Sequence, residues 1–221
     1  MRKTFLLVAL AAWAATASAQ TQPDGPTMGW SSWNTYASKI NAALIERQAK
    51  AMVDNGLKAV GYTYVNIDDG FQGGRDKTTG QLIINQTRFP GGLKPVVDSI
   101  HELGLKAGIY SDAGHNTCAG YYGGEKQEDG TGLYEHDQQD CDYFFKDMGF
   151  DFIKVDYCGG DAGQNSERLK LDEKSRYTAI SNAIKNTGRD VRFNVCRWNY
   201  PGTWVSNVAT SWRTTHDIAD A

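Results

Sequence analysis

The stretch FDFIKVD, residues 150–156, decides how this sequence folds. Its apolar side chains form a short run of the kind that a buried strand of a parallel sheet presents. A helical pattern over residues 137–148 precedes it and stops at Gly149, and a longer helical pattern follows over residues 169–185. A buried strand between two helices is typical of a parallel α/β sheet.

The same alternation extends along the rest of the chain. Expected strands cover residues 28–30, 62–68, 105–110, 150–156, 191–196 and 210–213. Expected helices cover residues 42–55, 93–103, 137–148 and 169–185. The fold class that this predicts is α/β, a (β/α)8 TIM barrel of which about six βα units are present.

A complete barrel of this type takes about 250 residues, whereas this sequence ends at Ala221. We therefore expect residues 20–221 to form one barrel domain that is truncated at its C-terminus. Its first and sixth strands should lie at open edges, with no hydrogen bond between them. Because open edges promote aggregation, we expect the 221-residue chain on its own to be insoluble or inactive.

The first residues have the order of a secretory signal peptide. Arg2 and Lys3 supply positive charge, an apolar stretch covers residues 5–15, and small residues close it at 17–19. The apolar stretch is shorter than the roughly 20 residues that a membrane-spanning helix needs. We expect cleavage between Ala19 and Gln20, a secreted or periplasmic protein, and no membrane span.

Composition narrows the classes of partner. Lys and Arg number 23 against 26 Asp and Glu, so we expect no surface for nucleic acid. The 6 Trp and 11 Tyr suit either a large core or stacking on sugar rings, and composition alone leaves both open. No His or further carboxylate joins Asp68 and Asp69 at ligand spacing, so we expect no metal site and no cofactor.

Four cysteines in a chain expected to be exported indicate disulfide formation, and three pairings are possible if all are oxidised. We favour Cys118 with Cys158, which follow neighbouring strands of the expected sheet. Cys141 and Cys196 either pair with each other or stay reduced. The close cysteine spacing of most zinc sites is missing from the sequence.

Polar side chains gather where the expected strands end, at Asp68, Tyr110, Asp156 and Arg213. In a parallel barrel these ends share one face, and the loops there surround a common pocket. Lys154 precedes Asp156 by two residues, so both side chains should point the same way. Its charge should lower the pKa of the Asp156 carboxyl, which suits an ionised nucleophile.

Five motifs follow one another in the order found in glycoside hydrolase family 27, the α-galactosidase or melibiase type, which this sequence resembles. They are MGWSSWN (28–34), IDDG (67–70), GIYSD (108–112), KVDYC (154–158) and WRTTHD (212–217). The resemblance implies that residues 20–221 are a catalytic barrel. It also implies hydrolysis of terminal α-D-galactosyl residues from oligosaccharides, glycans or galactomannans.

The resemblance assigns two catalytic carboxylates. Asp156 corresponds to the family's nucleophile and Asp217 to its general acid/base, which implies a double displacement with retention of the anomeric configuration. Because Asp217 must hold a proton for the leaving group, we expect burial or nearby negative charge around it.

The resemblance also implies the residues that bind the sugar. Asp68 and Asp69 would accept hydrogen bonds from the 4- and 6-hydroxyls of galactose, and Trp33 would form a floor beneath the ring. Arg213 would donate to a ring hydroxyl and pair with the carboxylates. The expected substrate-binding residues are Trp33, Asp68, Asp69, Tyr110, Lys154 and Arg213.

Two positions depart from the family's pattern. Gly70 and Phe71 stand where many members have Cys-Trp, and Arg197 stands where a Glu near the sugar's 2-position is common. We expect an altered pocket edge, which brings β-L-arabinopyranosidase or isomalto-glucan hydrolase activity into range. A sugar-binding protein without turnover is the alternative from another class, although both catalytic carboxylates are present.

Overall fold

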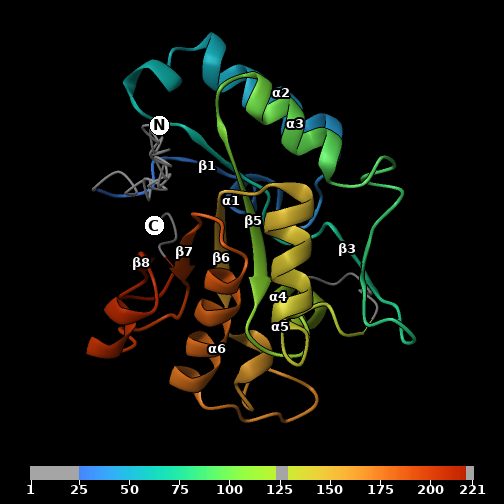
Figure 1. Cartoon of the computed structure of the whole chain (residues 1–221), viewed down its shortest axis with the longest axis vertical. Helices are drawn as coiled ribbons and strands as arrows, with labels where there is room; N and C mark the ends of the chain where they lie inside the picture. Colours follow the sequence, from blue (N-terminus) through green and yellow to red (C-terminus); the bar gives the residue numbers. More distant parts are fainter. Residues whose placement is uncertain (1–24, 123–128, 218–221) are drawn as a thin grey trace, which may run out of the picture.

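The structure is a computed structural model that describes residues 25–122 and 129–217. The expected signal peptide, residues 1–19, lies outside the described residues. At the centre is a curled parallel sheet with the strand order β1-β2-β5-β6-β7-β8 (Figure 1). Its strands are β1 (Gly29–Ser31), β2 (Tyr64–Asn66), β5 (Lys106–Asp112), β6 (Phe152–Asp156), β7 (Arg192–Val195) and β8 (Ser211–Trp212).

Each expected strand therefore has a counterpart, and the expected helices are present as well. In Figure 1, α2 and α3 lie side by side, and α5 and α6 follow around the outside of the sheet. The helices are α2 (Ala42–Asp54), α3 (Lys94–Glu102), α5 (Asp137–Cys141), which continues into the π-helix η2 (Asp142–Met148), and α6 (Glu173–Asn186).

Local chemistry explains how these helices begin and which face they bury. The Asn41 side chain accepts a hydrogen bond from the backbone N–H of Leu44 and so caps the start of α2. Asp172 caps α6 in the same way through the N–H of Ser175. The buried side chains of α2 recur at helical spacing and join the core between the helices and the sheet. They are Leu44, Ile45, Ala49 and Met52.

Several shorter elements were not expected. The antiparallel hairpin of β3 (Gln72–Arg75) and β4 (Leu82–Ile84) is inserted between β2 and α3. The others are short helical turns in the loops between the main strands and helices. They are α1 (Trp33–Tyr36), η1 (Lys58–Val60), α4 (Cys118–Tyr122), η3 (Cys158–Gly160) and η4 (Thr203–Asn207).

The sheet has the two open edges that the sequence predicts. In the described part of the chain, β1 pairs with β2 and β8 with β7, both in parallel, and β1 does not pair with β8. The six strands thus form an incomplete barrel. Across residues 25–122 and 129–217, no helix combines the length and apolarity that a membrane crossing requires.

The strand register brings functional side chains to one face. Tyr110 on β5 lies beside Lys154 on β6, and Asp112 lies beside Asp156. Because all six strands are parallel, their carboxyl ends meet at this face, and the loops that follow them can surround one pocket.

Candidate active site

A pocket of about 240 Å³ lies at the carboxyl ends of the strands. It receives side chains from β5 and β6 and from the segments after β1, β2, β7 and β8. Of the predicted catalytic and binding residues, it brings together Trp33, Asp68, Tyr110, Lys154, Asp156, Arg213 and Asp217.

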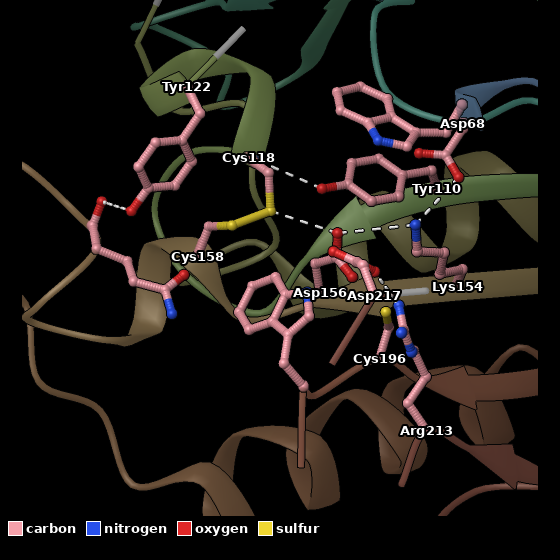
Figure 2. A pocket seen from close by; sticks show the side chains of 13 residues that line it. Asp68, Tyr110, Cys118, Tyr122, Lys154, Asp156, Cys158, Cys196, Arg213 and Asp217 are labelled. Carbon is pink, nitrogen blue, oxygen red and sulfur yellow. Dashed lines mark hydrogen bonds and ion pairs between the residues drawn. A yellow bond between two sulfur atoms is a disulfide. The ribbon is translucent and has the colours of Figure 1, made fainter. Parts of the chain in front are cut away.

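Lys154 and Asp156 are at the centre of the pocket (Figure 2). The Lys154 ammonium lies 3.8 Å from Asp156 Oδ2 and 3.1 Å from Asp68 Oδ2. It also lies 5.0 Å from the centre of the Tyr110 ring, within range of a cation–π interaction. One cation thus links a carboxylate that suits hydroxyl binding to the predicted nucleophile.

Burial changes the acidity of Asp156 in the direction opposite to the expected one. Asp156 is only 6% exposed, and this burial raises its pKa above the ordinary value for an aspartate. The charge of Lys154 lowers the pKa, as the sequence predicts, but the desolvation outweighs it. Without Lys154 the ionised form would be harder still to maintain.

The two oxygens of Asp156 have different surroundings. Oδ2 faces Lys154 and also lies 3.3 Å from Cys118 Sγ, whereas Oδ1 has no hydrogen-bond partner among the described residues. Oδ1 is enclosed by protein, so the part of the Asp156 side chain that is open to the pocket lies beyond this atom. The position of the carboxylate in the pocket suits attack on a bound electrophile.

Asp68 is fixed by several hydrogen bonds, among them one from the Asp69 N–H to Oδ1 over 2.9 Å. Ser31 Oγ donates to its carboxylate over 3.1 Å, its own backbone N–H donates to Ser32 Oγ over 3.0 Å, and Lys154 donates to Oδ2. Asp68 is 3% exposed and lines the pocket. Its position suits a charged acceptor for sugar hydroxyls.

Asp69 differs from what the sequence led us to expect. It does not line the pocket, because its carboxylate is turned toward α4. Its carboxylate accepts hydrogen bonds from Thr117 Oγ1 over 3.0 Å and from the backbone N–H of Ala119 over 2.8 Å. Asp69 therefore holds α4 against the end of β2.

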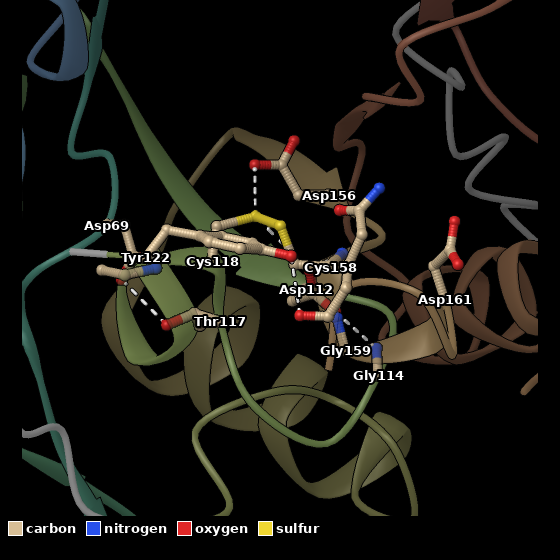
Figure 3. Close-up of a disulfide and its surroundings, with 12 residues drawn as sticks. Asp69, Asp112, Gly114, Thr117, Cys118, Tyr122, Asp156, Cys158, Gly159 and Asp161 are labelled. Carbon is tan, nitrogen blue, oxygen red and sulfur yellow. Dashed lines mark hydrogen bonds between the residues drawn. A yellow bond between two sulfur atoms is a disulfide. The ribbon is translucent and has the colours of Figure 1, made fainter. Parts of the chain in front are cut away.

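The predicted disulfide between Cys118 and Cys158 is confirmed, with a Cα–Cα distance of 5.2 Å (Figure 3). It joins α4 to η3 at the pocket wall. Cys141 and Cys196 are both free and buried, so of the two alternatives for this pair the reduced state holds. Burial raises the pKa of the Cys196 thiol, which keeps it neutral beside Asp156.

Asp112 fixes the backbone of the loops next to the disulfide. Its carboxylate accepts hydrogen bonds from the backbone N–H groups of Gly114, Cys158 and Gly159. The backbones are in close contact here, since a Cβ on Gly114 would lie 1.8 Å from the Gly159 carbonyl carbon. Only glycine fits at this crossing. No role for Asp112 was predicted from the sequence.

Asp217 and Arg213 form an ion pair at the edge of the pocket. The expected burial of Asp217 is not found, since its side chain is 73% exposed and its neighbour is a cation. The predicted pairing of Arg213 with a carboxylate is present. Asp217 is the last residue that the structure describes, so few described neighbours surround it.

The two departures from the family's pattern differ in their distance from the pocket. Phe71 is fully buried and packs edge-to-face against Phe144 in the core. Arg197 forms ion pairs with Asp161 and Glu173, each at 3.2 Å, and does not itself line the pocket. It lies 5.9 Å from the ring of Trp198, which does line it, so of the two residues only Arg197 is placed to affect the pocket edge.

One group of residues outside the pocket has the spacing of metal ligands. Ligand atoms of His115, Asp129 and Glu167 lie within 4.8 Å of one another on exposed loops. These residues connect the loops to one another. His115 Nε2 lies 2.8 Å from Asp129 Oδ1, and the Asn116 amide donates to the carboxylates of Asp129 and Glu167. We assign this group a structural role.

Two residues of the pocket wall were not predicted from the sequence. Tyr122 ends α4, and Gln164 lies in the loop after η3. Trp198 also lines the pocket. Two adjacent tyrosines at 121 and 122, in a polar and glycine-rich stretch, are the sequence feature that could have indicated a binding surface here.

Comparison with known proteins agrees with this geometry. A profile of the family described as alpha galactosidase A matches residues 25–221. The chain belongs to this family. A curated member, a probable alpha-galactosidase of Dictyostelium discoideum, is 43% identical over 197 residues, which is 88% of this chain and 46% of that protein. The chain thus spans less than half the length of this alpha-galactosidase.

Solved alpha-galactosidase structures share the fold. The alpha-galactosidase I of Mortierella vinacea superposes with a TM-score of 0.72 at 36% identity, covering 85% of this chain and 44% of that one. An alpha-galactosidase of Saccharomyces cerevisiae, solved with raffinose, superposes with a TM-score of 0.71 at 33% identity, covering 85% and 39%.

Proposed function

We propose that the protein is a retaining exo-glycosidase that removes terminal α-D-galactosyl residues from oligosaccharides, glycans or galactomannans. The observation that carries the proposal is the arrangement around Asp156, which is buried, lines the pocket and is bridged by Lys154 to Asp68. Family membership supports it, as does the raffinose in one similar structure, because raffinose ends in an α-galactosyl unit.

The chemistry we propose is a double displacement. Asp156 attacks the anomeric carbon and forms a covalent ester, while Asp217 gives a proton to the departing oxygen. Asp217 then takes a proton from water, the water oxygen attacks the same carbon, and Asp156 is released. Two inversions give net retention.

The residues around Asp156 bind the sugar. Asp68 accepts hydroxyl hydrogens, Trp33 and Tyr110 offer aromatic faces, and Arg213 donates from the edge. The charge of Lys154 favours the ionised form of Asp156 and so opposes the effect of burial on its pKa. Asp69 contributes indirectly, through α4.

A panel of nitrophenyl glycosides tests this function on the full-length gene product. We expect release of nitrophenol from the α-D-galactoside in preference to the β-L-arabinopyranoside and α-glucosides, and none from an Asp156→Ala variant. Binding of galactose without turnover would show the non-catalytic alternative instead. Preference for the arabinopyranoside would reassign the substrate.

We also propose that the protein acts outside the cytoplasm. The signal-like order of residues 1–19 and the Cys118–Cys158 disulfide support this. N-terminal sequencing of the exported protein should begin at Gln20. A mature protein that starts at Met1 would contradict it.

A further inference from the structure

Tyr122 lies at the far end of the pocket from the charged residues. Figure 2 shows Asp68 and Tyr122 on opposite sides of Asp156, with the Cys118–Cys158 disulfide on the Tyr122 side. Tyr122 lines the pocket, yet it is 61% exposed, which is unusual for so large an aromatic side chain. Its ring is therefore accessible to a ligand that extends beyond Asp156.

The ring of Tyr122 is held in place. Its hydroxyl donates to the Gln164 carbonyl oxygen over 2.7 Å, and the hydroxyl of Tyr121 donates to Glu167 over 2.9 Å. The disulfide from Cys118 fixes the other end of the same short helix. A ligand that meets this ring does not have to immobilise it, which lowers the entropic cost of binding.

The loop that carries Gln164 is also held in place by hydrogen bonds. The Asn165 amide donates to the carbonyl oxygens of Gly159 over 3.2 Å and Leu169 over 2.9 Å, and its own oxygen accepts from the Leu169 N–H over 2.7 Å. Asn165 is 6% exposed. This network fixes the backbone at Gln164, whose side-chain amide can both donate and accept hydrogen bonds.

The two ends of the pocket thus differ in chemistry. The end at Asp68 and Lys154 carries charge and suits the hydroxyl-rich sugar that is cleaved off. The end at Tyr122 and Gln164 offers an aromatic face beside an amide, which suits the apolar C–H face and the hydroxyls of a second sugar ring. The bond to be cleaved lies between them, at Asp156.

We propose that Tyr122 and Gln164 form a binding subsite for the leaving group, and that its ligand class is a hexose ring attached to the terminal galactosyl unit. This inference rests on the proposed function. It gives the protein a preference for oligosaccharides over galactosides with small leaving groups.

The test compares two substrates on the full-length gene product. Raffinose places a sugar ring in the subsite, whereas α-D-galactosyl fluoride has a leaving group too small to reach Tyr122. Tyr122→Ala should lower kcat/KM for raffinose roughly fivefold to tenfold and change that for the fluoride by less than about twofold. Tyr122→Phe should keep most of the raffinose activity, because the ring remains.

Tyr62→Ala is the matched control. Tyr62 is a 40% exposed tyrosine just before β2, at the amino end of the strand, whereas the pocket lies at the carboxyl ends. It should leave the ratio between the two substrates unchanged. An unchanged ratio in Tyr122→Ala, or an equal loss in Tyr122→Phe and Tyr122→Ala, would overturn the subsite. Failure of the unaltered protein to cleave either substrate would instead overturn the proposed function, and the subsite with it.

Discussion

The Lys154 ammonium lies 3.8 Å from the Oδ2 atom of Asp156, in a pocket where that carboxylate is almost fully buried. Burial raises the pKa of Asp156, and Lys154 is the main group that opposes this rise. If Asp156 is the nucleophile, as proposed, it must be ionised to attack, and we expect the pair to set the lower pH limit of activity.

A Lys154→Met variant should therefore move the acid limb of kcat/KM to higher pH. The sign follows from charge: without the cation, the ionised carboxylate is less stable, its pKa rises further, and a higher pH is needed to form the nucleophile. Activity near neutral pH should fall by at least about tenfold. The measurement is a pH–rate profile on nitrophenyl α-galactoside, with exposed Lys50→Met as control. An acid limb that stays in place would argue against this role of Lys154.

The disulfide predicts a definite count of thiols. Of the four cysteines, Cys141 and Cys196 should react with Ellman's reagent in the denatured, unreduced protein, and Cys118 and Cys158 should react only after reduction. The full-length product can contain further cysteines, and these contribute the same number of thiols to the Cys118→Ala/Cys158→Ala double variant. The unaltered protein and this variant should therefore give equal thiol counts before reduction. Removing the bridge should cost about 3 kcal/mol of unfolding free energy, seen as a lower denaturation midpoint. Reactivity of Cys118 or Cys158 before reduction would contradict the pairing.

A buried ion pair should stabilise the loop behind α4. Arg75 on β3 makes a two-pronged contact with Asp140 at 2.6 and 2.9 Å, and it donates to the carbonyl oxygens of Gly130 and Gly132. Arg75→Met leaves the Asp140 carboxylate without this partner and should cost about 3 to 5 kcal/mol in urea unfolding.

The control for this variant is Arg189→Met, because Arg189 is a more exposed arginine that lies 3.7 Å from Asp151. It should change stability by less than about 1 kcal/mol. If the two arginine variants lost the same amount of unfolding free energy, the buried pair would contribute no more to stability than the exposed one.

The open edges of the sheet predict how residues 20–221 behave when expressed alone. Strands β1 and β8 each have one neighbour in the described structure, so both present unpaired backbone groups. We expect aggregation, measured by size-exclusion chromatography with light scattering. A soluble, monomeric and active preparation would mean that the six strands are sufficient.

The sequence predicted the framework of the fold because that framework rests on local patterns. Apolar runs such as residues 150–156 predicted each strand of the sheet, and Gly149 marked a helix end. The hairpin at β3 and β4 was missed because the strand QGGR lacks the apolar, β-branched residues that identify strands.

The site was predictable where a motif fixed it and not where tertiary contacts did. Alternation along β6 placed Lys154 and Asp156 together. The direction of the Asp69 side chain depends on Thr117 and Ala119, about 50 residues away. Tyr122 likewise acquires its place from a hydrogen bond to a distant loop, which no local pattern encodes.

The stereochemical course of hydrolysis tests the central claim most directly. Proton NMR of the first product formed from nitrophenyl α-D-galactoside by the full-length gene product should show α-galactose before any β-anomer appears, because attack by Asp156 and then by water inverts the carbon twice. Asp156→Ala should form neither anomer. Initial release of β-galactose would contradict the account, since it would mean that water displaces the leaving group directly and that Asp156 is not the nucleophile.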